Sequence, residues 1–183
     1  PDFNLEHQRL TYLKAVAALT ATSTDEQGYE QMQAFASQFE SDDPSPVARM
    51  AHANIMSHFD WHQNEMNRIR IRQAWESFFQ QWDFLICPVA CTAAFAHDHS
   101  PQMTRTLMVN GEPRRYMEGA FWAGLTSLPG LPSTVFPMGL TDAGLPVGLQ
   151  VVGKHYDDLL TIGCAGLIEK QFGGYQPPPA SSG

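Results

Sequence analysis

The sequence predicts an α/β fold in which helices come first and strands later. Apolar residues recur every three or four positions between residues 10 and 82, which indicates amphipathic helices. Short apolar runs bounded by Gly and Pro follow, which indicates buried strands. With 183 residues, of which 43% are hydrophobic, the chain is long enough for one domain with an apolar core.

Two helices are expected before residue 40. One face of the first consists of Leu10, Leu13, Ala17 and Thr20. The second is predicted to begin at the segment STDEQ, a capping box in which Ser23 caps the helix and Glu26 reaches back to it. Its apolar positions are Tyr29, Met32, Ala36 and Phe39. The segment SDDPSP is expected to end it.

A long helix is predicted from Val47 to Trp82, followed by a strand. The strand, Phe84 to Val89, is continuously apolar and stopped by Pro88, as is typical of a buried strand. Residues 90–116 show no clear period and are expected to form a long loop, and a loop of that length in a compact domain is usually functional. A short helix is expected over 117–128.

The rest of the chain predicts a hairpin, a helix and a tail. The hairpin strands span Ser133–Pro137 and Val147–Gly153, joined by the turn MGLTDAGLP. Gln150 lies inside an apolar run and needs a hydrogen-bond partner, for which a loop backbone is expected. The last helix spans 159–172, capped by Asp157 or Asp158 and stopped by a Gly-Gly pair. Residues 176–183 are expected to form a flexible tail. Three strands make a poor independent sheet, and two of them have the sequence of strands buried on both faces.

Composition excludes several classes of function. The net charge is -8, which repels the nucleic acid backbone and anionic membranes, so neither is an expected partner. No run reaches the roughly 18 apolar residues of a membrane helix, and none of the given residues is expected to form a signal peptide. Three cysteines in apolar surroundings indicate reduced, buried thiols and a cytoplasmic location. The chain begins with Pro1 instead of Met, as expected of a piece of a longer protein.

Four short motifs offer site chemistry, and each has a plainer interpretation. His58 and His62 are four positions apart and precede Glu65, a spacing that suits a metal or a polar helix face. His97 and His99 are a possible ligand pair or part of a polar loop. The segment CPVAC favours two packed thiols over a zinc module. The segment ASSG lies in a Pro-rich tail, where nothing would hold a nucleophile rigid. We therefore predict no metal, no cofactor and no catalytic residue in this chain.

Several spaced motifs in the second part occur in a specific order. The segment RIRIRQAWESFFQQWDFLICPV precedes WAGLTSLPGLPSTVFPMGLTDAGLPVGLQVVGKHYDDLLTIGCAGLIE. This order resembles the C-terminal half of an amidase signature enzyme. In that family an Arg-rich helix leads into a strand matched by Asp83 to Pro88. A Gly-Leu-Pro motif follows, here at 130–132, and then a Gly-Leu-Pro-x-Gly-x-Gln turn at 144–150 and a helix start at 157–160. The resemblance covers residues 68–172 and is looser for the first 67.

The resemblance implies the C-terminal part of an amidase-signature fold, a mixed sheet flanked by helices. Residues 1–67 would be a helical segment and residues 68–175 the C-terminal α/β part of the amidase domain. The family's Ser nucleophile, second Ser and Lys base lie in a Gly/Ser-rich region that nothing in this chain matches. The chain would thus be a fragment or processed portion whose partners are the N-terminal half of the same enzyme and a small-molecule amide. An alternative is a non-catalytic small-molecule binding or regulatory domain derived from the same fold.

In the family, the C-terminal half lines the substrate cavity. The candidate substrate-binding residues are therefore Phe95 and His97 in the loop, and Trp122, Leu125 and Thr126 in the helix before the Gly-Leu-Pro motif. Simple core packing is an equal interpretation of Trp122 and Leu125. Glutamine-using members carry an acidic residue at about the position of Ala120, so the resemblance implies a less polar amide. A register shifted by one would make Glu118 or Gly119 the comparison. The sequence sets no oligomeric state.

Overall fold

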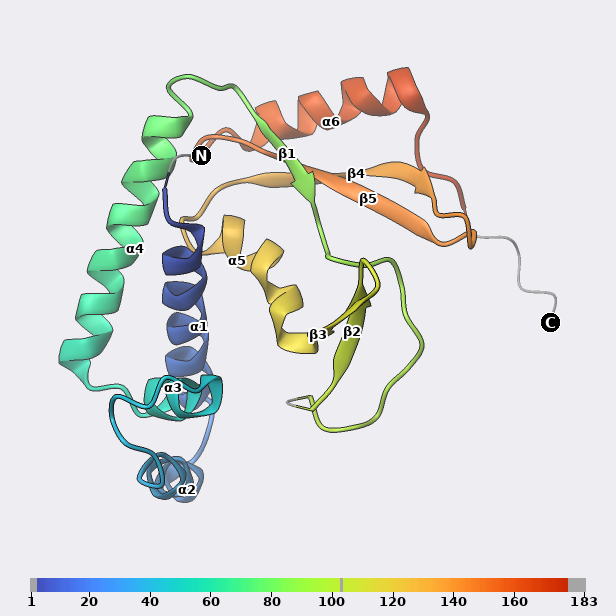
Figure 1. The fold of residues 1–183 in the computed structure, drawn as a ribbon. Coiled ribbons are helices and arrows are strands. Elements are labelled where there is room, and N and C mark those ends of the chain that lie inside the picture. Colours follow the sequence, from blue (N-terminus) through green and yellow to red (C-terminus); the bar gives the residue numbers. More distant parts are fainter. Residues whose placement is uncertain (1–2, 103, 178–183) are drawn as a thin grey trace. The chain divides into compact units, whose positions relative to one another are not determined.

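The computed structural model describes residues 3–102 and 104–177 (Figure 1). The described chain falls into two compact units, and the division lies between Ala74 and Trp75. The predicted tail lies outside the described residues from residue 178 onward, as does the segment ASSG. Within the described ranges, none of the helices combines the length and apolar character that crossing a membrane requires.

The first unit is helical. It contains α1 (Leu5–Ala21), α2 (Glu26–Ala36), α3 (Pro46–Asn54) and most of α4 (His58–Phe78). Helix α3 packs against both α1 and α2. The buried apolar residues are mostly alanines, namely Ala17, Ala21, Ala36, Ala48, Ala51 and Ala53. Small side chains at a helix contact allow a short distance between helix axes.

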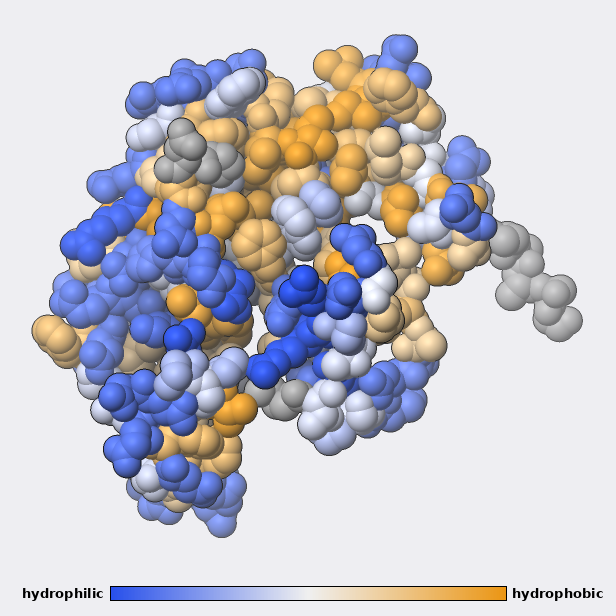
Figure 2. Space-filling model, in the orientation of Figure 1, coloured by the Kyte–Doolittle hydropathy of each residue, from blue (hydrophilic) through white to orange (hydrophobic). Residues whose placement is uncertain are grey.

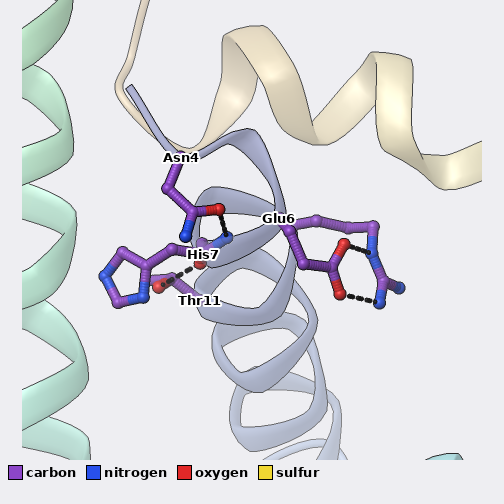
Figure 3. A network of polar contacts seen from close by, with 5 residues as sticks. Asn4, Glu6, His7 and Thr11 are labelled. Atoms are coloured by element: carbon purple, nitrogen blue, oxygen red, sulfur yellow. Dashed lines mark hydrogen bonds and ion pairs between the residues drawn. The ribbon is translucent and has the colours of Figure 1, made fainter. Parts of the chain in front are cut away.

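Helix α1 begins with a polar network (Figure 3). The Asn4 side chain accepts a hydrogen bond from the His7 backbone N–H at 2.9 Å, which caps the helix. The Thr11 hydroxyl donates to the His7 carbonyl at 2.8 Å, so it is buried with its hydrogen bond made. Asn64 on α4 donates to the Thr11 carbonyl at 3.1 Å and ties α4 to α1. The predicted apolar face of α1 is partly wrong, because polar Thr11 is buried whereas Thr20 is exposed.

Two predictions about helix ends in this unit are wrong. Helix α2 is capped by Asp25, whose carboxylate accepts from Gly28 N at 2.8 Å, and not by Ser23. The long helix expected from residue 47 to residue 82 is two helices, because Ser57 interrupts it. The Ser57 hydroxyl accepts from the Asp60 N–H at 3.1 Å and donates to its carboxylate at 2.6 Å. A serine in that role starts a new helix at its own position.

The second unit is built on a three-stranded antiparallel sheet with the order β1-β5-β4. The strands are β1 (Leu85–Pro88), β4 (Ser133–Leu140) and β5 (Pro146–Val152). Helix α6 (Asp158–Phe172) packs on β4 and β5. The core between them is Phe136, Val151 and Ala165, and the hydroxyls of Thr134 and Thr161 lie 2.9 Å apart across it. The α/β prediction is confirmed, and every strand pair among the described residues is antiparallel.

Gln150 on β5 and Gly153, directly after β5, explain why the sheet and α6 pack closely. Gln150 donates to the Pro88 carbonyl at 2.9 Å, so its partner is backbone, as predicted, but at the end of a neighbouring strand. A Cβ at Gly153 would lie 2.6 Å from Thr161 Cγ2, so only glycine lets α6 lie this close. Asp157 stands at the N-cap position of α6 but makes no capping hydrogen bond, contrary to the prediction.

A second hairpin replaces the end of the predicted loop. Strands β2 (Thr106–Val109) and β3 (Glu112–Arg115) pair antiparallel around Asn110 and Gly111, whose φ angles are 53° and 81°. Positive φ at both central residues is the requirement of a type I′ turn, which Asn-Gly satisfies best. The chain then enters η1 (Tyr116–Ala120) and α5 (Phe121–Ser127). Of the loop expected at 90–116, the described residues up to 105 are irregular, and regular structure begins at Thr106.

The expectation that strands are buried on both faces is wrong for β1 and β4, whereas β5 is buried on both faces over its last three residues. Ile86 on β1 is 50% exposed, and Val135 and Met138 on β4 are 56% and 62% exposed. Within the described residues, β1 and β4 each pair on one side only. The sequence of these strands is suited to neighbours that the described chain does not supply.

Candidate functional site

A groove lies between the loop after β1 and the β2–β3 hairpin. It encloses about 440 Å³ and is lined by residues 92–98, 105–108 and 116. Phe95 and His97, both predicted from the sequence, line this groove and are exposed. The structure therefore brings these two candidates together at one surface.

Tyr116 and Arg105 shape the wall opposite the loop. The rings of Phe95 and Tyr116 meet edge to face, with centroids 6.1 Å apart. The Arg105 guanidinium lies 5.5 Å from the centre of the Tyr116 ring, and its Nε donates to the Ser100 carbonyl at 2.5 Å. These contacts fix the guanidinium against an aromatic face, a cation–π arrangement.

The polar groups of the groove include a carboxylate, a guanidinium and an imidazole. Asp98 accepts a hydrogen bond from the Ser100 N–H at 2.8 Å, and hydrogen bonds from Ser100 hold the pKa of its carboxyl below the usual value. The charge of Arg105 lowers that pKa further. The imidazole of His97 packs edge to face on that of His99 at 6.2 Å. Such a wall can bind and orient a partly aromatic ligand.

The other three candidates lie on α5 and do not line the groove. Leu125 is 4% exposed and Thr126 is also buried, while Trp122 is partly exposed and packs edge to face on Phe121. The Thr126 carbonyl accepts from the Leu131 N–H at 2.9 Å, which closes the turn into β4. The burial of Leu125 agrees with core packing. A place for these residues in a substrate cavity stays a prediction.

Arg105 and Tyr116 were missed by the sequence analysis. They flank the β2–β3 hairpin, and the Tyr116 N–H donates to the Arg105 carbonyl at 3.0 Å. The signal that could have found them is the dipeptide Asn110-Gly111, which favours the two-residue turn of a hairpin. Recognising that turn places residues 106–109 opposite residues 112–115, and thus Arg105 beside Tyr116.

The alternative metal ligands do not converge. The His58 ring stacks on Trp61 at 5.8 Å, and both His58 and His62 are exposed. Across residues 3–102 and 104–177, no three His, Cys, Asp or Glu side chains are grouped as metal ligands would be. All three cysteines are free thiols, with Cys87 buried and the other two partly buried. Burial raises the pKa of the Cys87 thiol, and a hydrogen bond with Gln150 opposes that rise.

Comparison with known families identifies the family of this chain. The family model described as Amidase matches residues 5–162. The chain belongs to the amidase signature family. This amidase-family chain is 32% identical over 106 residues to a glutamyl-tRNA(Gln) amidotransferase subunit of Wolbachia pipientis subsp. Culex pipiens, a match over 58% of this chain and 20% of that protein. The corresponding subunit of Zymomonas mobilis is 32% identical over 112 residues, covering 61% of this chain and 21% of that protein.

Solved amidase structures share the fold. A chain from a vestigial complex, described in connection with the origins of an s-triazine catabolic enzyme, superposes with a TM-score of 0.71 at 18% identity, covering 97% of this chain and 36% of that one. A bacterial aryl acylamidase of the amidase signature family gives 0.65 at 21% identity, covering 94% and 35%. At these identities the likeness shows the fold alone. This chain thus spans about a fifth of its curated relatives and about a third of these solved chains.

Proposed function

We propose that this chain is the C-terminal portion of an amidase that hydrolyses a carbon–nitrogen amide bond through an acyl-enzyme on a Ser outside the chain. The observation that carries the proposal is the family match over residues 5–162, in a chain that spans only about a third of the solved relatives. In this reaction a Ser attacks the amide carbonyl, the amine leaves, and water hydrolyses the acyl-enzyme. The portion described here would supply scaffold and substrate-cavity wall.

The lysines support a catalytic centre elsewhere. A Lys that acts as a base needs its pKa lowered, most often by burial. The three lysines of the chain, Lys14, Lys154 and Lys170, are all exposed. The hydroxyls of Ser57 and Ser127 make local contacts at helices, to Asp60 and to the Ala123 carbonyl. These groups are engaged in local structure and are poor choices for a Ser–Lys pair.

The groove supports the role of cavity wall. Phe95 and Tyr116 offer an apolar, aromatic surface, and Arg105 and His97 add polar groups at its rim. The curated relatives are amidotransferase subunits named for glutamyl-tRNA(Gln), but Ala120 stands where we place an acidic residue in glutamine-using members. We therefore propose an amide less polar than glutamine as the substrate. We also propose a cytoplasmic location, which suits three unpaired thiols.

The test is to assay the chain alone and together with the remaining, upstream portion of the same protein. We expect no hydrolysis of aliphatic amides, aromatic amides or glutamine by the chain alone, and hydrolysis of apolar amides by the complex. Turnover by the chain alone that disappears in Ser181→Ala or Ser182→Ala would contradict the proposal. A chain that binds small amides tightly but shows no turnover in any complex would favour the binding-domain alternative.

Substitution of two tryptophans separates cavity wall from scaffold. Trp75 is fully buried, and its ring stacks on Phe79 within the aromatic cluster at the end of α4. Trp122 is partly exposed on α5. In the active complex, we expect Trp122→Ala to change the ratio of kcat/KM for aromatic over aliphatic amides, whereas Trp75→Ala lowers stability and leaves that ratio unchanged. If both variants have the same ratio of kcat/KM for aromatic over aliphatic amides, Trp122 does not belong to the cavity wall.

A further inference from the structure

Helix α6 carries two apolar stripes. The inner stripe lies on the sheet and consists of Thr161, Cys164, Ala165 and Ile168. The second consists of Leu159, Ile162, Gly163, Gly166 and Leu167. These five positions follow the i, i+3, i+4, i+7, i+8 spacing of a helix face that packs against a neighbour. We call this set the outer face of α6.

The outer face is open in the described chain. Leu159, Ile162 and Leu167 are 83%, 56% and 68% exposed, and Figure 2 shows apolar side chains gathered over α6. A helix that is apolar on all sides is normally buried. Contiguous exposed apolar surface marks a place where something else binds.

Two glycines at the centre of this face also indicate that it packs against another element. A Cβ at Gly163 or Gly166 would meet no atom within 4 Å. Glycine is a poor helix former, so the described packing gives no reason for glycine at either position. Removing side chains from a helix surface lets a second helix approach closely, because the distance between helix axes depends on the side chains at the contact.

We propose that the outer face of α6 packs against an apolar helix from the part of the amidase-family protein that this chain does not span. This inference rests on the proposal that the chain is a portion of a longer enzyme. The solved chain with TM-score 0.71 is covered to only 36% of its length, so most of that fold lies outside the present chain. The five residues of the outer face carry no charge, which suits a packed apolar interior better than a polar peptide.

The experiment uses Leu167→Gln and Gly166→Leu, with Leu19→Gln on α1 as the matched control. Leu19 is 71% exposed, close to the 68% of Leu167. Each chain is titrated against the tagged remaining portion of the same protein, and Kd and amide turnover are measured. Burial of one leucine side chain corresponds to a change in Kd of about tenfold or more, so we expect at least about tenfold weaker association for Leu167→Gln and little change for the control.

The glycine variant separates loss of assembly from loss of folding. Since a Cβ at Gly166 would meet no atom within 4 Å and leucine is a better helix former than glycine, Gly166→Leu should leave the melting temperature of the isolated chain unchanged or raise it. The same variant should weaken association by about tenfold or more if a helix packs closely there. If the outer face of α6 stayed in solvent, Gly166→Leu would not weaken association while the melting temperature is unchanged or higher.

The outcomes distinguish this inference from the proposed function. An active wild-type complex in which both α6 variants associate as tightly as the wild type would overturn the inference alone. Equal weakening by Leu19→Gln and Leu167→Gln would also overturn it. A chain that forms a stable dimer, broken by Leu167→Gln without effect on the active complex, would assign the face to a second copy. Absence of both complex and activity for the wild type would overturn the inference together with the proposed function.

Discussion

Gln150 joins two strands through its side chain. It is 4% exposed and donates to the Pro88 carbonyl, which lies 62 positions earlier in the chain. Gln150→Leu should lower the free energy of unfolding by about 1–3 kcal/mol, because it leaves a carbonyl at the end of β1 without this donor. Urea unfolding measures the loss. Gln171→Leu, at an exposed position of α6, should change stability by less than about 0.5 kcal/mol. Equal effects of the two substitutions would contradict this role.

Cys87 makes the free energy of unfolding depend on pH in the alkaline range. Burial raises the pKa of its thiol in the folded chain above that of an exposed thiol, about 8.5. The unfolded chain then loses this proton first as pH rises, so the contribution of Cys87 is complete below the unfolded pKa and is lost above it. We expect the wild-type unfolding free energy to fall more steeply between pH 8 and pH 10 than that of Cys87→Ala. Parallel pH profiles of the two proteins would refute this assignment.

Helix starts can be tested one at a time. Asp25 accepts from the Gly28 N–H at the start of α2, whereas Ser23 lies outside the helix. Asp25→Ala should destabilise the chain by about 1 kcal/mol. Ser23→Ala should cost less than about 0.5 kcal/mol, since the structure gives it no capping role. Thermal unfolding of the two variants, side by side, decides between the observed cap and the capping box expected from the sequence.

The elements that the sequence predicted well are those fixed by local patterns. Strand β5 and helix α6 lie within one residue of their predicted ends because Gly and Pro bound them and apolar residues fill them, whereas β4 was expected to end at Pro137 and continues to Leu140. The break before Ser57 was missed because an apolar period continues across it, although α3 ends at Asn54 and the contacts between Ser57 and Asp60 begin α4. The β2–β3 hairpin was missed because each strand has only four residues and β3 is polar and exposed throughout, so the turn dipeptide is the clearest signal for it. The groove depends on that hairpin, so only its loop side could be predicted.

The isolated chain should associate with itself. Strands β1 and β4 have unpaired edges among the described residues, and apolar side chains are exposed on β1, β4 and α6. Unpaired edges and large exposed apolar patches recruit other chains. We therefore expect concentration-dependent assembly in light scattering and binding of a hydrophobic dye, with both effects suppressed by the remaining portion of the protein. A monodisperse monomer that melts cooperatively and binds no dye would show a self-sufficient domain.

The pairing of β1 with β5 has a consequence for the order of events during synthesis. Leu85 pairs with Val152, so β1 leaves the ribosome long before its partner exists. At a synthesis rate of about 5–20 residues per second, the wait is on the order of 3–13 s. Loop closure over such a separation is also slow compared with local helix formation. The helical first unit therefore has time to form before β1 can pair with β5. During this interval the apolar residues 84–89 are unpaired, and a chaperone that recognises short apolar segments can bind them.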